Sequence, residues 1–279
     1  MIETVRNVED LREQVREWRV QGLNVGLVPT MGALHAGHMA LAERSIATTD
    51  RTIATLFVNP KQFGEGEDLD GYPRDEVRDR EKLAQAGVHF LFAPDVAQMY
   101  PSNFSTGVKV GGLGDILEGK FRPGFFDGVA TVVSKLLNQT GAGKAFFGEK
   151  DYQQLQVITR MTRDLNIPTI IEGVPTIREE DGLALSSRNV YLNSQERTAA
   201  PILFKTISEV ASKVKAGDNI SELEAWGREQ VLAAGFSNVD YLSVLDAQTL
   251  EAYLGPVRPG RVLVAAKLGR ARLIDNVAV

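Results

Sequence analysis

The sequence predicts an α/β protein with a Rossmann-like, doubly wound parallel sheet and a second, smaller α+β domain. Through residues 1–176, short apolar runs that end in Pro, Gly or Asn alternate with segments of helical periodicity. Strands that alternate with helices are joined by right-handed crossovers, so the sheet they form is parallel. The alternation then gives way to a polar stretch. We therefore expect a first domain over residues 1–176 and a smaller one over residues 177–279.

The first helix is predicted behind Asn7, a plausible capping residue, and it should end near Gly22. Its apolar positions recur at helical spacing and are Val8, Leu11, Val15 and Trp18. The strands that follow are predicted in NVGLVPTMG, RTIATLFVNP, VHFLFAP, KAFFGEK and PTIIEGV. The helices between them are predicted in HAGHMALAERSIATT and over residues 74–86, 129–138 and 152–165. In the second domain we expect one long helix over 194–215, another over 221–234, and final strands in NVDYLSVLD and GRVLVAAKLG.

Composition restricts the classes of function. With 43% hydrophobic and 24% charged residues, the chain can build a folded core. Its net charge of -5 gives no general attraction to nucleic acid or to an anionic membrane. The absence of cysteine excludes disulfides, thiolate catalysis and thiolate metal sites. No apolar run approaches the roughly 20 residues of a membrane span, and no signal sequence is visible. We expect a cytoplasmic protein without a nucleic-acid or membrane partner.

Polar segments follow three of the predicted strands: Pro29–His38, Asn59–Gln62 and Gly148–Asp151. In an open parallel sheet, ligands bind outside the carboxyl ends of the strands. The three segments should therefore lie at one edge of the sheet and form the binding site.

Two of the three histidines, His35 and His38, lie three residues apart where the first of these strands gives way to a helix. The unpaired N–H groups of a helix start bind phosphate, and imidazoles there can donate to phosphate oxygens as charge develops. Incidental turn histidines or metal ligands remain alternatives, although no third ligand with metal spacing is visible. We expect His89, inside VHFLF, to be a packed or edge residue.

Amides and cations complete the candidate site. Asn59 and Gln62 can recognise hydroxyl and carboxylate groups, although Asn59 could instead hydrogen-bond its own turn before Pro60. Lys150 can contact nucleotide phosphates and Asp151 can accept from ribose hydroxyls, unless the two form a solvated ion pair. The stretch LALSSRN offers hydroxyls and a guanidinium to a triphosphate, or serves as a helix cap and linker.

These motifs resemble a known family. His35-Ala36-Gly37-His38 looks like the H-x-G-H signature of the nucleotidyltransferase superfamily and of class I aminoacyl-tRNA synthetases. Seven blocks in the same order resemble the pantothenate synthetase family: PTMGALHAGH, FVNPKQF, EDLDGYPR, RPG with FDGV, FGEKDYQQL, DGLALSSRN and ARLIDN. The resemblance implies an ATP-dependent ligase that condenses pantoate with β-alanine through a pantoyl adenylate. It further implies Mg²⁺ with the ATP, and a homodimer.

The resemblance also implies roles for particular residues. His38, His35 and Lys150 would be catalytic, and Gln62 and Gln154 would hold pantoate, with Gln62 also beside the β-alanine site. ATP would contact three segments, which comprise Met31, Gly32, Ala33, Leu34, His35, Ala36, Gly37 and His38; Gly148, Glu149, Lys150 and Asp151; and Ile177, Leu185, Ser186, Ser187 and Arg188. Lys150 and Arg188 would then grip ATP from opposite domains, and closure of the smaller domain would act as a lid.

Two positions qualify the resemblance. Asp79 matches a family position associated with magnesium and the phosphates, although most helical aspartates have no such role. At Phe125 this chain reads R-P-G-F-F where the family usually reads R-P-G-H-F, so an aromatic ring replaces a histidine.

Three other functions fit the sequence less well than the ligase. A nucleotidyltransferase acting on a phosphorylated substrate should carry extra basic residues, whereas FVNPKQF offers mainly amides. A nucleotide-sensing module would bind ATP without turnover. The short chain, its acidic balance and the lack of a basic domain disfavour a tRNA-acylating enzyme.

Overall fold

The computed structural model describes residues 2–64, 69 and 71–279, which pack as two compact units. The first unit comprises residues 1–149 and 154–175, and the second comprises residues 150–153 and 176–279. The change of unit after Pro175 lies next to the boundary expected from the sequence, but the short segment Lys150–Gln153 departs from that expectation. Within the EDLDGYPR block, Glu67, Asp68 and Asp70 lie outside the described residues.

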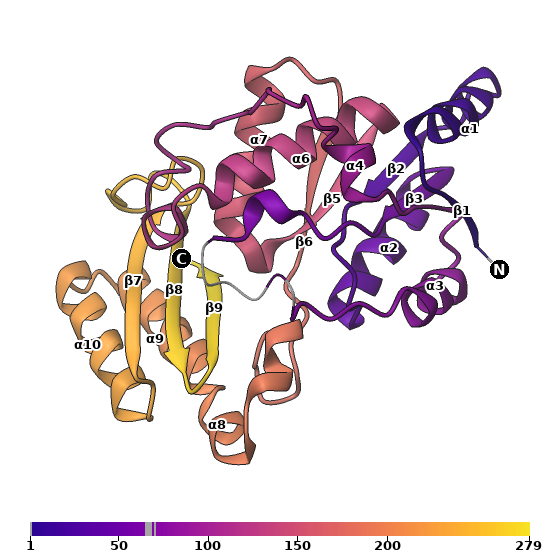
Figure 1. Cartoon of the computed structure of the whole chain (residues 1–279). Helices are drawn as coiled ribbons and strands as arrows, with labels where there is room; N and C mark the ends of the chain where they lie inside the picture. Colours follow the sequence, from indigo (N-terminus) through magenta and orange to yellow (C-terminus); the bar gives the residue numbers. More distant parts are fainter. Residues whose placement is uncertain (1, 65–68, 70) are drawn as a thin grey trace. The chain divides into compact units, whose positions relative to one another are not determined.

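The first unit contains a six-stranded parallel sheet, as expected for the predicted fold class (Figure 1). Its strand order is β1-β4-β3-β2-β5-β6. The strands are β1 (Glu3–Val5), β2 (Val25–Val28), β3 (Arg51–Thr55), β4 (Phe90–Phe92), β5 (Lys144–Gly148) and β6 (Ile170–Val174). The chain runs outward from β2 through β3 to β4 and then returns to the other side of β2 at β5. The strand order therefore reverses between β2 and β5, where ligands bind in open α/β sheets.

Helices cover both faces of this sheet because its crossovers run in two directions. The crossovers from β2 to β3 and from β3 to β4 carry α2 (Ala36–Thr48) and α3 (Glu76–Gln85), which pack together on one face. Crossovers that step the opposite way carry α1 (Val8–Val20), α6 (Phe125–Thr140) and α7 (Tyr152–Asp164) on the other face (Figure 1). Shorter helices are α4 (Val96–Met99), α5 (Glu118–Phe121), η1 (Pro60–Gln62) and η2 (Glu149–Asp151).

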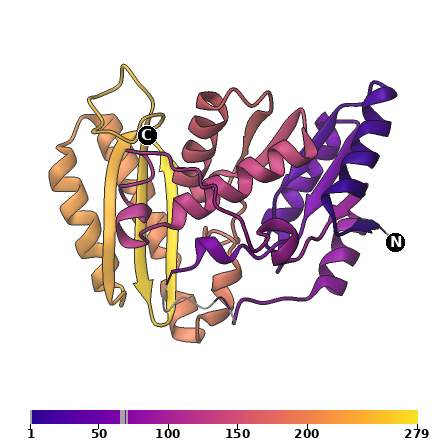
Figure 2. The ribbon, with the colours of Figure 1, turned by 45° about the horizontal axis from the view of Figure 1, so that its top comes forward.

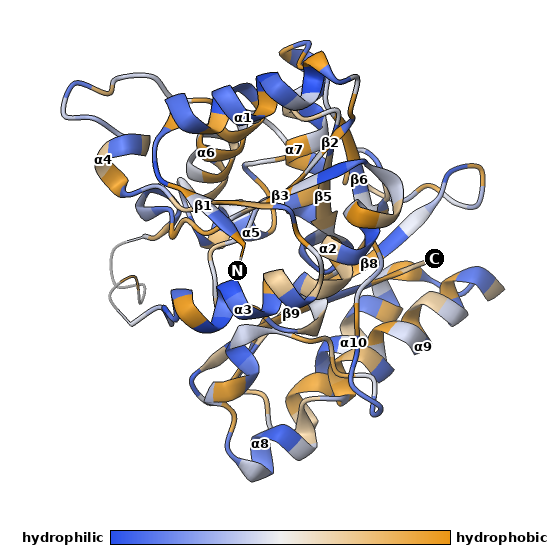
Figure 3. Cartoon of the chain, turned by 90° about the vertical axis from the view of Figure 1, so that its right-hand side faces the viewer, coloured by the Kyte–Doolittle hydropathy of each residue, from blue (hydrophilic) through white to orange (hydrophobic). Residues whose placement is uncertain are grey.

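The first helix illustrates how local sequence sets these elements. Asn7 caps α1, with its Oδ1 accepting from the Asp10 N–H at 2.9 Å, as the sequence predicted. Leu11, Val15 and Trp18 are buried along one face, and the Trp18 ring meets Phe90 of β4 edge-on with ring centroids 5.7 Å apart. Hydrophobic and hydrophilic residues alternate around the helices in Figure 3, as expected when each helix buries one face. None of the described helices combines the length and apolar character that a membrane span requires.

The second unit contains a three-stranded antiparallel sheet backed by helices (Figure 2). Its strands are β7 (Asn238–Asp246), β8 (Gly260–Leu268) and β9 (Ala271–Ala278), in that order across the sheet. The helices α9 (Ile202–Ala216) and α10 (Ile220–Ala233) pack on one face and enclose an apolar core with it. Two further elements, η3 (Ser187–Tyr191) and α8 (Ser194–Ala199), precede α9.

Two sequence predictions for this unit were wrong in detail. The single helix expected over 194–215 is divided into α8 and α9, because Pro201 has no N–H with which to continue the α8 hydrogen-bond ladder. The final strand β9 was not predicted. Its polar residues Arg272, Asp275 and Asn276 interrupt the apolar pattern, yet it pairs with β8 over its whole length.

Candidate active site

The turn after β2 is held in place by a side chain of α3. Gly32 and Ala33 have left-handed backbones, with φ of 89° and 52°. The N–H groups of Ala33 and Leu34 donate to Oδ2 and Oδ1 of Asp79 at 2.8 and 2.9 Å, and Lys82 Nζ donates to the Leu34 carbonyl. Asp79 is only 3% exposed. Its carboxylate therefore stabilises a strained turn, while magnesium binding by Asp79 remains a prediction.

The two histidines interlock at the start of α2. His35 is the capping residue, and its Nδ1 accepts from the Gly37 N–H at 3.1 Å. His38 Nδ1 accepts from the His35 N–H at 3.3 Å, and the ring centroids are 4.2 Å apart. When either ring is neutral, an accepting Nδ1 places the proton on Nε2. The structure thus adds a capping role without removing the phosphate role expected from the sequence.

The part of the chain that the structure describes holds no group of three or more His, Cys, Asp and Glu placed to bind an ion. The third histidine, His89, directly precedes β4, and its side chain is exposed rather than packed in the core. His89 Nδ1 accepts from the Thr52 N–H at 3.1 Å. Burial, with a smaller effect of Arg51, lowers the pKa of His89.

The turn after β3 contains Asn59 and Gln62. Asn59 Nδ2 donates to Gln62 Oε1 at 3.0 Å and to the Gly128 carbonyl at 3.1 Å, while Asn59 Oδ1 accepts from Lys61 N–H at 3.3 Å and from Tyr100 OH at 2.8 Å. Burial raises the pKa of Tyr100, so its hydroxyl stays a donor. These bonds match the turn role that the sequence left open for Asn59. Substrate binding by Asn59 itself remains a prediction.

Gln62 links this turn to the one after β2. Its Nε2 lies 3.1 Å from Met31 Sδ, so the expected acid-binding amide adjoins the expected nucleotide-binding turn. The approach of α6 fixes the position of Gln62, because a Cβ on Gly128 would lie 2.2 Å from the Lys61 carbonyl oxygen. Only glycine permits this contact.

Phe125, which stands where the family usually has a histidine, is linked to the turn after β3 through Arg122. The Arg122 guanidinium stacks over the Phe125 ring, 3.7 Å from its centroid. Arg122 Nη2 then donates to the Gln62 carbonyl at 3.3 Å. The aromatic ring that replaces the family histidine therefore supports an arginine that contacts the backbone of a candidate substrate-binding residue.

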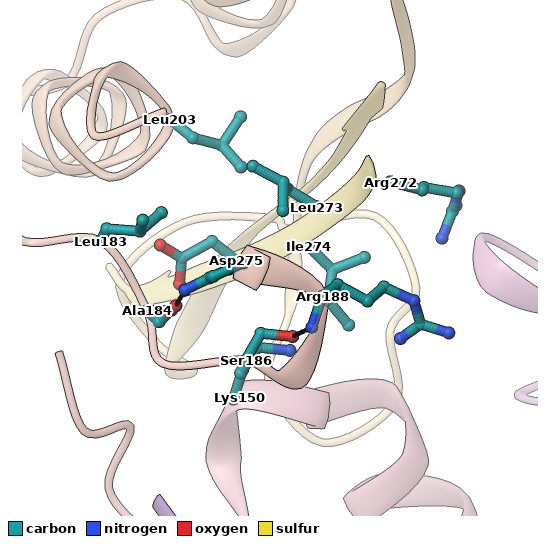
Figure 4. Close-up of a pocket in the computed structure, with 11 residues that line it drawn as sticks. Lys150, Leu183, Ala184, Ser186, Arg188, Leu203, Arg272, Leu273, Ile274 and Asp275 are labelled. Carbon is teal, nitrogen blue, oxygen red and sulfur yellow. Dashed lines mark hydrogen bonds between the residues drawn. The ribbon is translucent and has the colours of Figure 1, made fainter. Parts of the chain in front are cut away.

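In the second unit, Lys150, Ser186 and Arg188 line one pocket (Figure 4). Ser186 Oγ accepts from the Arg188 N–H at 3.2 Å and caps η3, so the cap role left open for LALSSRN is present. The Lys150 side chain is 16% exposed and its Nζ lies 4.0 Å from Asp151 Oδ2, a long ion pair. Two further predicted ATP contacts lie beside this segment, where the Leu185 N–H donates to the Ile177 carbonyl at 3.0 Å.

The expectation that Lys150 and Arg188 lie on opposite domains differs from the structure. Residues 150–153 pack with the second unit, whereas Glu149 and Gln154 belong to the first. The physical reason is a set of contacts to β8 and to the β7–β8 loop: the Arg261 guanidinium lies 4.0 Å from the Tyr152 ring centroid, and Tyr152 OH donates to the Ala247 carbonyl at 3.0 Å. Sequence reasoning missed these anchors.

A parallel sheet whose strand order reverses beside an H-x-G-H helix start defines a Rossmann-like nucleotide-binding protein. The family model described as pantoate-beta-alanine ligase matches residues 3–278, and the chain belongs to this family. It is 54% identical over 274 residues to the pantothenate synthetase of Chelativorans sp. (strain BNC1), with 98% of this chain and 96% of the relative covered. It is 53% identical over 278 residues to that of Paramagnetospirillum magneticum, with 100% and 98% covered.

Solved structures agree with this assignment. The pantothenate synthetase of Thermus thermophilus superposes with a TM-score of 0.93 at 47% identity, covering 99% of each chain. The pantoate-beta-alanine ligase of Francisella tularensis, complexed with beta-gamma ATP and beta-alanine, superposes with a TM-score of 0.83 at 32% identity, covering 99% of this chain and 97% of the other.

Proposed function

We propose that the chain condenses pantoate with β-alanine at the expense of ATP, releasing pantothenate, AMP and pyrophosphate. The observation that carries this proposal is the family match over residues 3–278. The Francisella tularensis relative, crystallised with beta-gamma ATP and beta-alanine, supports the same two substrates for this chain. The histidine pair at the start of α2 and the pocket lined by Lys150 and Arg188 supply groups suited to a nucleotide. The amides of the turn after β3 supply groups suited to a hydroxy acid.

The reaction needs ATP because a free carboxylate has no good leaving group. A carboxylate oxygen of pantoate attacks the α-phosphorus, and the bond to pyrophosphate breaks. The amine of β-alanine then attacks the acyl carbon and loses a proton, and AMP leaves with the oxygen that pantoate contributed. Both steps need positioned substrates and neutralised charge rather than a covalent enzyme nucleophile. The absence of cysteine is consistent with this route.

Each group has a role in the proposal. His35 and His38 donate from Nε2 to phosphate oxygens as negative charge develops during adenylation. Lys150, Ser186 and Arg188 bind the triphosphate, and the backbone of the Met31–Leu34 turn approaches the nucleotide. Gln62 and Gln154 bind the hydroxyl and carboxylate groups of pantoate.

Magnesium enters with ATP as part of the substrate. In the portion of the chain that the structure describes, no three or more His, Cys, Asp and Glu converge to hold an ion. Mg²⁺ is usually bound with nucleotides mainly through phosphate oxygens and water, and we propose the same here, with Asp79 as the one candidate protein ligand. We further propose a cytoplasmic homodimer, whose mass can be measured by light scattering.

The test is isotope exchange between pyrophosphate and ATP. With pantoate, magnesium and ATP but no β-alanine, labelled pyrophosphate should enter ATP, because the first step is reversible and needs only the acid. Exchange should stop when pantoate is withheld. Exchange that requires β-alanine would contradict a separate adenylation step. Exchange that proceeds without pantoate would favour a different acceptor for the nucleotidyl group.

A further inference from the structure

The carbonyl of Lys150 is bound by a side chain from the last strand. Asn276 of β9 donates from Nδ2 to the Lys150 carbonyl oxygen at 2.9 Å. Asn276 is 3% exposed, so water competes little for this bond. The bond joins a residue of η2 to one 126 positions later in the chain, and both belong to the second unit.

The orientation of the Asn276 amide is determined by its other partner. Arg261 Nε donates to Asn276 Oδ1 at 2.7 Å, which leaves Nδ2 on the side of Lys150. The same Arg261 guanidinium stacks on Tyr152, two residues beyond Lys150. Asn276 and Arg261 therefore hold the segment that carries Lys150 from two sides.

The neighbouring Asp275 holds the other phosphate-binding segment. Its carboxylate makes a bidentate ion pair with Arg178, at 2.7 and 2.8 Å, and its Oδ1 accepts from the Asn276 N–H at 2.7 Å. Arg178 Nη1 donates on to the Gly182 carbonyl at 3.0 Å, in the segment that leads to Ser186 and Arg188. Asp275 and Asn276, which are adjacent and buried on β9, therefore anchor the two segments that carry Lys150 and Arg188 to the pocket in Figure 4.

We propose that Asn276 is a positioning residue, which holds Lys150 next to Arg188 so that the second unit presents a preformed pair of cations to the ATP phosphates. The inference rests on the proposed role of Lys150 in binding ATP. Two cations on flexible segments would lose conformational entropy when they bind phosphate, whereas cations fixed beforehand do not. The role of Asn276 is exerted through Lys150 and requires no contact with ATP.

The test substitution is Asn276→Asp, which has the same shape, keeps the oxygen that accepts from Arg261 and removes the donor to Lys150. The KM for ATP should rise about fivefold, which corresponds to about 1 kcal/mol at 1.4 kcal/mol per tenfold change. The KM for pantoate should stay within about twofold, since the loss of one bond is confined to the ATP-binding segment. The matched control is Asn219→Asp, the cap of α10, where the aspartate still accepts from the Glu222 N–H and wild-type kinetics are expected.

A double-mutant cycle with Lys150→Ala separates the possible outcomes. In the Lys150→Ala background, Asn276→Asp should cause no further loss of ATP affinity, measured by calorimetry. If Lys150→Ala leaves ATP affinity unchanged, the assignment of Lys150 fails. If Lys150→Ala weakens ATP binding but Asn276→Asp is like wild type, or its effect persists in the double mutant, only the positioning role is overturned.

A second substitution tests the same idea without adding charge. Tyr152→Phe removes the hydroxyl that donates to the Ala247 carbonyl and leaves the ring under Arg261. It should raise the KM for ATP by about two- to threefold with the pantoate KM unchanged, and thus gives a result even if Asn276→Asp fails to fold. Equal rises in both constants would indicate a general structural effect and overturn the proposal.

Discussion

At the scale of single residues, His38 combines a capping contact with a proposed role in the reaction, and a substitution can separate the two. Its Nδ1 accepts from the His35 N–H within the capping box of α2, and its Nε2 is the atom proposed to donate to the phosphates. Asparagine places an oxygen near the position of Nδ1 and has no atom at Nε2. His38→Asn should therefore keep the cap and the melting temperature, while turnover falls about 100-fold because one charge-stabilising donor is lost. Steady-state kinetics and thermal unfolding measure the two effects.

The control for this substitution is His89→Asn. His89 Nδ1 also accepts a backbone N–H, from Thr52, but the residue is exposed, directly precedes β4 and has no proposed role in the reaction. Its asparagine variant should turn over like wild type. Wild-type turnover in a folded His38→Asn variant would remove His38 from the proposed chemistry.

The sequence indicated candidate residues for the site, but it could not indicate their hydrogen-bond partners within the chain. H-x-G-H identified the histidines, and the spacing alone could not say which ring nitrogen faces the backbone. The two roles considered for Asn59 could not be separated either, because its partners Tyr100 and Gly128 come from segments 41 and 69 residues away. Contacts of this range are set by tertiary packing, which local pattern does not encode.

At the scale of elements, α3 controls the turn that follows β2. Asp79 accepts both the Ala33 and the Leu34 N–H, and it is buried. In Asp79→Asn, the amide N–H of the new side chain would face one of these two backbone N–H donors. The variant should therefore lose about 1–3 kcal/mol of stability. Its turnover should also fall, because the turn that carries the proposed nucleotide contacts is held less firmly. Chemical denaturation and steady-state kinetics measure these changes.

The same substitution separates the turn role from a metal role. If Asp79 acts on the turn, excess Mg²⁺ will not restore turnover to Asp79→Asn. Restoration by Mg²⁺ would show instead that Asp79 binds the metal. Asp75→Asn is the matched control, because Asp75 caps α3 and asparagine caps helices about as well as aspartate.

Among the elements, the strongly periodic ones were predicted and the irregular ones were not. The strands β2 to β6 and the amphipathic α1 follow from apolar runs and helical spacing, whereas β1 is only three residues long and gives no pattern. The strand β9 was missed because the polar side chains of Asp275 and Asn276 are buried by partners that are distant in sequence, Arg178 and Lys150. The ARLIDN block was the one signal, and it came from family resemblance rather than from periodicity.

At the scale of the whole molecule, the amides proposed to bind pantoate and the cations proposed to bind the triphosphate lie in different units. The amides Gln62 and Gln154 belong to the first unit, and the cations Lys150 and Arg188 belong to the second. Amides match the hydroxyl and carboxylate groups of pantoate, whereas cations match the phosphates of ATP. The cations of the second unit are therefore expected to act on ATP affinity and the two amides of the first unit on pantoate affinity, although the histidines proposed to act on the phosphates also belong to the first unit.

This division predicts which kinetic constant each substitution changes. Gln154→Ala should raise the KM for pantoate about tenfold, the effect of about 1.4 kcal/mol from a lost hydrogen bond, with the KM for ATP within about twofold. Arg188→Ala should raise the KM for ATP roughly 10- to 100-fold, because hydrogen bonds to charged groups contribute about 1.5–3 kcal/mol. The KM for pantoate should stay within about twofold. Arg163→Ala, at an exposed arginine paired with Asp164, controls for the loss of surface charge. Equal changes in both constants for Gln154→Ala or Arg188→Ala would show that these amides and cations do not act on different substrates.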